Sequence, residues 1–406
     1  MSKASPQQIP VVVLAGFLGS GKTTLLNYLL HHSGGTRIGA IVNDFGSIEI
    51  DAMAVAGQLG DSTVSLGNGC LCCAVDAGEL DVYLDKLTRP VNDLHAIDVI
   101  VIEASGIAEP QELVRMVLAS ENPRVVYGGL VEVVDAAEFD ATREKHPEVE
   151  RHLALADLVV VNKADRVEDG ERQRVLDAVR DAAERAAVVT ASYARIDPDL
   201  LFDSRPSTER IGQLSFDDLH REDLHREDLH REDLHREDQH RDDQHRDGLR
   251  PGADHRGHLH AAYDSVAFTS DVPMDPRRLM AFLDGRAEGL YRIKGYVDFG
   301  TGDPRNRYAV HAVGRFLRFY PEPWPAGERR LTQLVLIGSG IDAEALHDEL
   351  AACASESGSG SERGSGSEQS DAPHPADERG MWGVLRYVQD KGDPAPDAAD
   401  YDTAEI

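Results

Sequence analysis

The stretch Gly16-Phe-Leu-Gly-Ser-Gly-Lys-Thr23 fits the pattern G-x-x-x-x-G-K-[ST] at every fixed position. It follows the apolar run Val11–Ala15 and leads into the amphipathic stretch Lys22–Leu30, so it joins an expected strand to an expected helix. Glycines in such a loop let backbone N–H groups curl around phosphate oxygens, and the helix N-terminus adds partial positive charge. The stretch therefore predicts a phosphate-binding loop, hereafter the P-loop.

The polar groups of the P-loop have expected roles in binding and in catalysis. Lys22 is expected to reach the β- and γ-phosphates of a nucleotide, and the Thr23 hydroxyl to bind Mg²⁺. We therefore assign Lys22 to the catalytic residues as well as to the binding residues. The residues expected to hold the phosphates are those of the motif and the start of its helix: Gly16, Gly19, Ser20, Gly21, Lys22, Thr23 and Thr24.

The region from about residue 9 to residue 190 alternates short apolar runs with amphipathic stretches. Strands that are apolar throughout and are separated by helices predict a mostly parallel sheet covered on both faces, which is the α/β class. The expected strands are Val11–Ala15, Ile38–Asn43, Ile97–Glu103, Val125–Val134 and Leu158–Asn162. The expected helices are Lys22–Leu30, Glu79–Leu87, Glu112–Leu118 and Glu171–Val179.

A second, smaller folded region begins near Tyr263 and is expected to be an α+β domain. Its expected strands are Tyr263–Phe268, Tyr291–Phe299, Tyr308–Phe319 and Gln333–Ile337, and its expected helices are Pro276–Leu283 and Ala343–Cys353. The domain organisation that we expect is a P-loop domain over 1–203, a His-rich flexible linker over 204–260, the C-terminal α+β domain over 261–354 and an acidic, largely disordered tail over 355–406. Within that tail, the short segment Met381–Val388 is a candidate for docking onto a folded part.

The composition excludes several classes of protein. Lys and Arg number 42 against 72 Asp and Glu, and the net charge of −30 argues against a broad basic face for nucleic acid or for anionic membranes. No apolar run approaches the ~18 residues of a membrane helix, and Val11–Leu18 lacks a cleavage-site pattern, so we expect neither a membrane span nor a signal peptide. Four cysteines, three of them clustered, make no disulfide framework, and we place the protein in the cytoplasm.

The segment Asn162-Lys-Ala-Asp165 follows the apolar run Leu158–Val161 and has the form of a guanine-reading loop. Guanine presents N1–H and an exocyclic amine side by side, and the one carboxylate of Asp165 accepts both. Adenine lacks this donor pair, so a desolvated carboxylate would be left unpaired against it. We therefore expect GTP, bound in part by Asn162, Lys163 and Asp165. The alternative is a turn with an Asx motif.

Glu103 ends the apolar run Ile97–Ile102 and begins the segment Glu103-Ala-Ser-Gly106. An acid at the end of a buried strand beside the P-loop is placed to hold Mg²⁺ or its water, and Gly106 allows the backbone to approach the γ-phosphate. The segment Asn43-Asp-Phe-Gly46 is the candidate first switch. Since no glutamine is obvious for orienting the attacking water, Asp44 and Glu103 are our catalytic candidates. The alternative for Asp44 is a helix cap or a turn.

The segment Asn68-Gly-Cys-Leu-Cys-Cys73 places three thiols, those of Cys70, Cys72 and Cys73, in four positions. Thiolates are good ligands for Zn²⁺, and a permanent structural site would need a fourth protein ligand. A three-thiol site with an open or borrowed fourth position suits exchange of the metal. A redox pair and buried structural cysteines are the alternatives. The remaining cysteine, Cys353, lies on the apolar face of an expected helix and is expected in the core.

A pentad repeat, Leu-His-Arg-Glu-Asp, starts at Leu219 in a stretch with almost no apolar periodicity. A period of five gathers the leucines onto one stripe in neither a helix nor a strand, so a solvated linker is expected. Neutral imidazole binds Zn, Co and Ni, and a flexible repeat can bring two or three such groups together. Weak, exchangeable metal sites are thus expected at His220, His225, His230 and His235. An inert spacer is the alternative.

Together these residues resemble the CobW family of P-loop GTPases, of the SIMIBI class. The motifs that carry the resemblance are Gly16-Phe-Leu-Gly-Ser-Gly-Lys-Thr-Thr-Leu-Leu-Asn27, Gly69-Cys-Leu-Cys-Cys73, Glu103-Ala-Ser-Gly-Ile-Ala-Glu-Pro110, Asn162-Lys-Ala-Asp165 and, in the second domain, Arg292-Ile-Lys-Gly295. The resemblance implies GTP hydrolysis coupled to delivery of a transition metal, most often Zn²⁺ and as a variant Co²⁺, to a client metalloprotein. The first switch departs from the family pattern at Asp44 and Ser47, where Glu49 is a candidate substitute.

Three other functions stay open at this point. Cobalt handling for cobalamin biosynthesis would use the same motifs, a nucleotide kinase would share the P-loop, and a His-rich metal-storage protein would not need hydrolysis. The sequence also leaves the oligomeric state open and identifies no particular client.

Overall fold

The structure is a computed structural model, and it describes residues 8–33, 36–43, 63–66, 77–88, 97–106, 108–202, 263–354 and 375–388. The structural statements that follow refer to these residues. Among them, no helix has both the length and the hydropathy of a transmembrane span.

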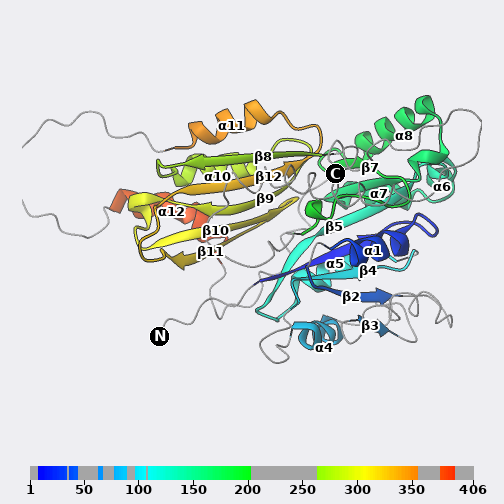
Figure 1. The fold of residues 1–406 in the computed structure, drawn as a ribbon, viewed down its shortest axis with the longest axis horizontal. Helices are drawn as coiled ribbons and strands as arrows, with labels where there is room; N and C mark the ends of the chain where they lie inside the picture. Colours follow the sequence, from blue (N-terminus) through cyan, green and yellow to red (C-terminus); the bar gives the residue numbers. More distant parts are fainter. Residues whose placement is uncertain are drawn as a thin grey trace, which may run out of the picture. The chain divides into compact units, whose positions relative to one another are not determined.

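Seven strands of the described residues form one parallel sheet in the first domain, in the order β3-β2-β4-β1-β5-β6-β7 (Figure 1). They are β1 (Ile9–Ala15), β2 (Ile38–Asn43), β3 (Thr63–Leu66), β4 (Val99–Glu103), β5 (Val125–Asp135), β6 (Leu158–Asn162) and β7 (Ala187–Thr190). The described helices among them are α1 (Lys22–His31), α4 (Ala77–Thr88), α5 (Pro110–Leu118), α6 (Phe139–Lys145), α7 (Glu148–Leu155) and α8 (Asp169–Ala182). The expected α/β class, with a mostly parallel sheet, is confirmed.

Both faces of this sheet are covered, because successive side chains of a strand point to opposite sides. In β1, Val12 packs with Leu25 of α1, whereas Val13 packs in a separate core with Leu113 of α5. Every residue of β4 and of β6 is buried. The helices therefore hold the strands from both sides, and the carboxyl ends of β1, β4, β5 and β6 meet along one edge, where the P-loop lies.

Four elements of the first domain have no counterpart among the predictions: β3, β7, α6 and α7. The two strands have four residues each and the two helices seven and eight, so a periodic pattern has little length in which to stand out. The predicted strands at β2 and β6 have the observed bounds, and the other predicted elements of this domain differ from the observed ones only at their ends.

The second domain contains five antiparallel strands in the order β11-β10-β9-β12-β8. These strands are β8 (Asp264–Ser270), β9 (Leu290–Val297), β10 (Asn306–Val313), β11 (Phe316–Pro323) and β12 (Thr332–Gly338), and the described helices are α10 (Pro276–Asp284), α11 (Ala343–Ala352) and α12 (Pro375–Leu385). The start of α10 is capped, because the Asp275 carboxylate accepts from the backbone N–H groups of Arg277 and Arg278. The expected α+β class of this domain is confirmed.

The expectation of one strand over Tyr308–Phe319 is wrong. The chain makes a hairpin there, in which β10 and β11 pair in antiparallel register from Val313 opposite Phe316. The two residues between them begin with Gly314, whose φ of +52° lies in the left-handed region that tight hairpin turns require. An apolar pattern that continues on both sides of a two-residue turn hides the turn from a periodicity argument.

Helix α12 lies within the region 355–406, which the sequence analysis assigns to a largely disordered tail. It packs against α10, and the side chains of Met381 and Val384 lie in the core of the second domain. Beyond the helix, Phe319 of β11 donates its backbone N–H to Tyr387 O at 2.9 Å. The core of the second domain therefore extends past residue 354.

Replacing Met381 with alanine is expected to lower the free energy of unfolding of the second domain by about 2–4 kcal/mol. Its side chain is 3% exposed, and the change would leave a cavity under α12. Denaturant unfolding followed by circular dichroism measures the loss. Trp382→Ala is the matched control on the same helix, because Trp382 is 65% exposed and its removal should change stability by less than about 0.5 kcal/mol. Equal losses would contradict the docking of α12.

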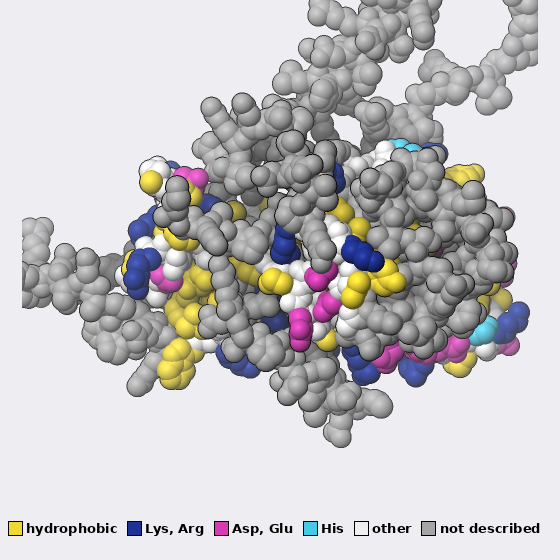
Figure 2. All heavy atoms as spheres, turned by 90° about the horizontal axis from the view of Figure 1, so that it is seen from below, with side chains coloured by type: hydrophobic (Ala, Val, Ile, Leu, Met, Phe, Trp, Pro, Cys, Tyr) yellow, Lys and Arg dark blue, Asp and Glu magenta, His cyan; other side chains and the backbone are white. Residues whose placement is uncertain are grey.

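Charged side chains of both signs are interspersed with apolar ones on the face seen in Figure 2. Among the described residues visible on this face, no broad basic area stands out, in keeping with the net charge of −30. Large apolar side chains that are exposed in the described part of the chain are those of Leu18, Val82, Leu155, Tyr193, Trp382 and Leu385.

Candidate functional site

The P-loop joins β1 to α1, and two of its glycines hold backbone conformations that other residues rarely adopt. Gly16 has φ +142° and Gly21 has φ +110°. A Cβ atom on Gly16 would lie inside contact distance of the Val133 carbonyl, and one on Gly21 would overlap the side-chain amide of Asn162. The loop is therefore packed closely against β5 and β6, which only a chain without side chains at these positions permits.

The side chain of Lys22 is held across the P-loop. Its ammonium donates to the carbonyl oxygens of Gly16 at 2.8 Å and of Phe17 at 3.2 Å. Burial lowers the pKa of Lys22, while the charges of Glu103 and Glu132 act to raise it. The ammonium is thus fixed over the loop whose backbone is expected to cradle phosphates.

Thr23 and Glu103 bring two oxygens together at the start of α1. Thr23 Oγ1 donates to Glu103 Oε1 at 2.6 Å, and Glu103 is 5% exposed. The contact follows from the sheet order, because β4 pairs with β1 and Glu103 lies opposite Leu14, just before the P-loop. Hydroxyl and carboxylate oxygens are the ligands that Mg²⁺ prefers, so this pair fits the ion expected from the sequence.

Gly106 lies against the tip of the P-loop. A Cβ atom at this position would come within 2.8 Å of the backbone N and Cα of Leu18. The segment that follows β4 therefore approaches the loop as closely as two backbones can, at the place where a γ-phosphate is expected.

Asn162 ends β6 and connects the P-loop to the loop after β7. Its side-chain amide donates to Ser20 O at 2.9 Å, and its Oδ1 accepts from the backbone N–H of Ala194 at 2.8 Å. Asn162 is 2% exposed, so both bonds are shielded from water. The side chain therefore fixes the phosphate loop and the neighbouring loops at the end of β6 and β7 as one unit.

Lys163 and Asp165 follow at the same edge of the sheet. Lys163 has φ +57°, a left-handed conformation that turns the chain out of β6, and its ammonium pairs with Asp135 at 2.5 Å. Asp165 lies in a short 3-10 helix, Ala164–Arg166, and is exposed. Its carboxylate is available to accept the paired donors of a guanine base.

Asp135 is a residue that the sequence analysis missed, although a signal was present. It follows the apolar run Val125–Val134, as Glu103 and Asn162 follow theirs, and the carboxyl ends of parallel strands meet at one edge. Glu132 was missed for a different reason. An acid inside an apolar run gives no hint of its neighbour, and its effect on Lys22 arises only in the folded chain.

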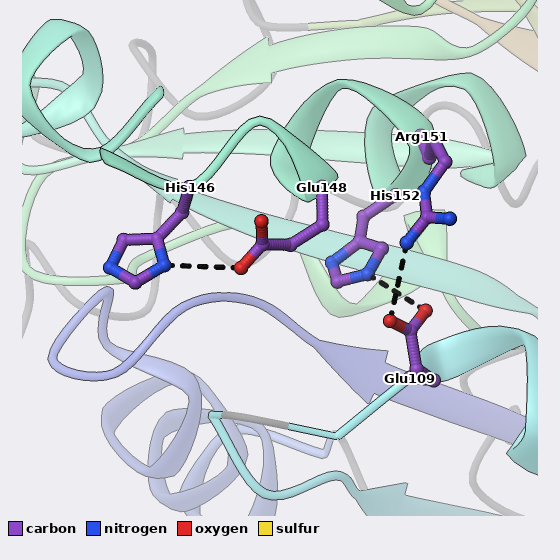
Figure 3. Close-up of polar contacts among 5 residues, drawn as sticks. All are labelled: Glu109, His146, Glu148, Arg151 and His152. Atoms are coloured by element: carbon purple, nitrogen blue, oxygen red, sulfur yellow. Dashed lines mark hydrogen bonds and ion pairs between the residues drawn. The ribbon is translucent and has the colours of Figure 1, made fainter. Parts of the chain in front are cut away.

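A second group of polar contacts lies on α7 and the chain beside it (Figure 3). Glu109, just before α5, pairs with Arg151 and with His152 of α7, each at 3.3 Å. His146 Nδ1 lies 3.0 Å from the Glu148 carboxylate, and its ring centre is 4.5 Å from that of an aromatic ring in the P-loop. Partly exposed ion pairs of this kind add little stability, but they connect the P-loop and the start of α5 to one helix.

Part of the predicted site lies outside the described residues: Asp44, Cys70, Cys72, Cys73, His220, His225, His230 and His235. Within the described part of the chain, no group of three His, Cys, Asp or Glu side chains is arranged to hold a metal ion. Cys353 is confirmed as a core residue, since it is 4% exposed and lies in the core of the second domain. The other predicted phosphate-binding residues, Gly19 and Thr24, lie in the P-loop and the first turn of α1.

Comparison with known proteins identifies both domains. Residues 10–190 match the family described as the CobW/HypB/UreG nucleotide-binding domain, and residues 263–354 match the cobalamin synthesis protein cobW C-terminal domain. The structure of Zn(II)-bound YjiA GTPase from Escherichia coli aligns with 86% of this chain and 100% of its own, at 22% identity and a TM-score of 0.37.

Two curated relatives align over most of the chain. A protein named zinc chaperone CobW from Pseudomonas aeruginosa is 31% identical over 383 residues, covering 84% of this chain and 91% of the relative. A protein of the same name from Sinorhizobium sp. is 29% identical over 369 residues, covering 83% and 94%. Since the identity extends through both domains, the chain belongs to the CobW family of P-loop GTPases and carries that family's C-terminal domain.

Proposed function

We propose that this chain hydrolyses GTP and uses the state of the nucleotide to control the transfer of Zn²⁺ to a client metalloprotein. The observation that supports the nucleotide part most directly is the pair of buried hydrogen bonds made by Asn162. They fix the P-loop relative to the loops that follow β6 and β7. One guanine nucleotide can then meet Lys22 at its phosphates and Asp165 at its base.

The residues of the site have separate roles in this proposal. Lys22 binds the β- and γ-phosphates and offsets the charge that develops during transfer. Thr23 and Glu103 would hold Mg²⁺, directly or through water, and the bound ion supplies neutralisation of phosphate charge. Gly106 brings backbone to the γ-phosphate. Asp44 and Glu103 are the candidates for positioning the attacking water.

The metal part of the proposal rests on the chemistry of the thiols and on the relatives named zinc chaperones. Cys70, Cys72 and Cys73 are the proposed Zn²⁺ ligands. In the sequence they lie between Asn43–Gly46 and Glu103–Gly106, the two segments proposed to meet the γ-phosphate. Ordering of these segments by GTP would therefore reshape the thiol site. The linker histidines are proposed as secondary, weaker sites, and Co²⁺ is the competing metal.

Titration of Zn²⁺ into the full chain, in the presence of a non-hydrolysable GTP analogue and of GDP, tests the coupling. We expect the two nucleotide states to differ in Zn²⁺ affinity by about 5-fold to 150-fold, the usual range of coupling between two sites. Coupling is reciprocal, so Zn²⁺ should change the affinity for the analogue by the same factor. Equal affinities in the two states would remove the nucleotide control.

The matching variants separate the thiols from the rest of the chain. The triple change Cys70→Ser, Cys72→Ser and Cys73→Ser is expected to abolish the tight Zn²⁺ site and to leave GTP binding intact. Cys353→Ser is the control, because this thiol is buried in the second domain. A triple variant that still binds Zn²⁺ like the parent would rule out the cluster as the site.

A further inference from the structure

A cavity of about 460 Å³ lies between the tip of the P-loop, the end of β5 and the helix α6. Its wall includes Phe17–Ser20, Glu132–Asp135 and Lys163. The residues assigned to the phosphates, the Mg²⁺ and the base are not part of it: Lys22, Thr23 and Asp165. The cavity therefore lies beside the expected nucleotide position, and its volume is in the range of sites for small molecules.

Two oxygens on the wall of this cavity are buried with no hydrogen-bond partner among the described residues. They are Oε2 of Glu132 and Oγ of Ser20, and the two residues are 2% and 1% exposed. Buried polar atoms in folded proteins nearly always have a partner. Since both residues line the same cavity, a single ligand group can satisfy both oxygens.

The charges around Glu132 favour a cationic ligand. Lys22 is the cation that acts on Glu132, but its ammonium is bonded to carbonyl oxygens of the P-loop. Lys163, on the same wall, is paired with Asp135. Burial raises the pKa of Glu132 to about 8, so its carboxyl is mostly neutral at pH 7 until a positive group enters. The other titratable residues of the wall are more exposed: Glu138, Lys145 and His146, the last of which is seen in Figure 3.

We propose that this cavity binds a small alkylguanidinium compound, whose N–H groups donate to the Glu132 carboxylate and to the Ser20 hydroxyl. A guanidinium group presents its N–H donors in one plane, so it can serve two acceptors at once. The alkyl part would contact the apolar part of the wall, which consists of Phe17, Phe139, Val149 and their neighbours. This site is independent of the proposed metal cargo.

Isothermal titration calorimetry of ethylguanidinium into the nucleotide-free full chain at pH 8 tests the site. We expect saturable binding of ethylguanidinium and at least about tenfold weaker binding of ethylurea, a neutral molecule of nearly the same shape. Glu132→Gln should weaken the binding of ethylguanidinium by at least about tenfold. Glu144→Gln is the matched control, because Glu144 is an exposed acid of α6 that does not line the cavity.

The binding should also depend on pH, because the bound cation favours the carboxylate whereas the free cavity favours the neutral acid. The affinity is expected to fall about tenfold for each pH unit below 8 in the parent chain, and to stay level in the Glu132→Gln variant. Equal affinity for ethylurea would overturn the proposal, since charge would then play no part. Complete loss of binding at saturating GDP would also overturn it, since the cavity would then belong to the nucleotide site.

Discussion

Replacing Lys22 with alanine is expected to lower kcat/KM for GTP by at least about a hundredfold, the usual effect of removing one preorganised donor to developing charge. In the structure its ammonium is held by two P-loop carbonyl groups, so the charge is already in place before a nucleotide binds. Alanine would leave the phosphates without this charge. Steady-state hydrolysis and the binding of a fluorescent GDP analogue measure the two parts of the loss.

Lys86→Ala is the matched control for this experiment. Lys86 is an exposed lysine of α4, so the change removes one positive charge from the same domain without touching the P-loop. It should leave both affinity and rate within about twofold of the parent, as expected of a surface change. A Lys22→Ala variant that behaved like this control would show that the nucleotide binds elsewhere.

Asp165→Asn is expected to lower kcat/KM for GTP by about a thousandfold or more, because a site built for a hydrogen-bonding pattern strongly rejects a mismatched one. The amide of this variant presents one donor and one acceptor, whereas guanine offers two donors side by side. Xanthine has a carbonyl in place of the exocyclic amine and therefore matches the amide. The variant should consequently hydrolyse xanthosine triphosphate faster than GTP, in a direct comparison of the two rates.

Asp169→Asn tests whether the change in preference comes from position or from charge alone. Asp169 is an exposed acid in the first turn of α8, four residues beyond the base-reading position. Its replacement should preserve the preference of the parent for GTP. If Asp165→Asn also preserved that preference, Asp165 would not be the residue that reads the base.

Much of the first domain could be predicted because its signals are local. The run at β6 is apolar at every position and ends in Asn162, and the run at β4 ends in Glu103 in the same way. A strand buried on both faces leaves this pattern in the sequence, and a polar residue that ends it marks the functional edge of the sheet. The phosphate loop is predictable for the same reason, since its spacing is fixed by backbone contacts.

The contacts that the sequence did not predict join residues that are far apart in the chain. Asn162 was expected to take part in reading the base, but its bonds to Ser20 and Ala194 depend on the order of β1, β6 and β7. The position of Glu132 on a cavity wall depends on the placement of α6, an element too short to predict. The turn at Gly314 was missed because the strands on both sides of it are apolar.

The contact between Phe319 and the chain after α12 also affects how this protein behaves when it is shortened. β11 is the outermost strand of its sheet, and the backbone groups on its open side can pair with a strand from a neighbouring molecule. In the intact chain Tyr387 occupies part of that side. A fragment cut at Ala354 would lose this protection, and we expect it to aggregate through strand-to-strand association unless the last helix is retained.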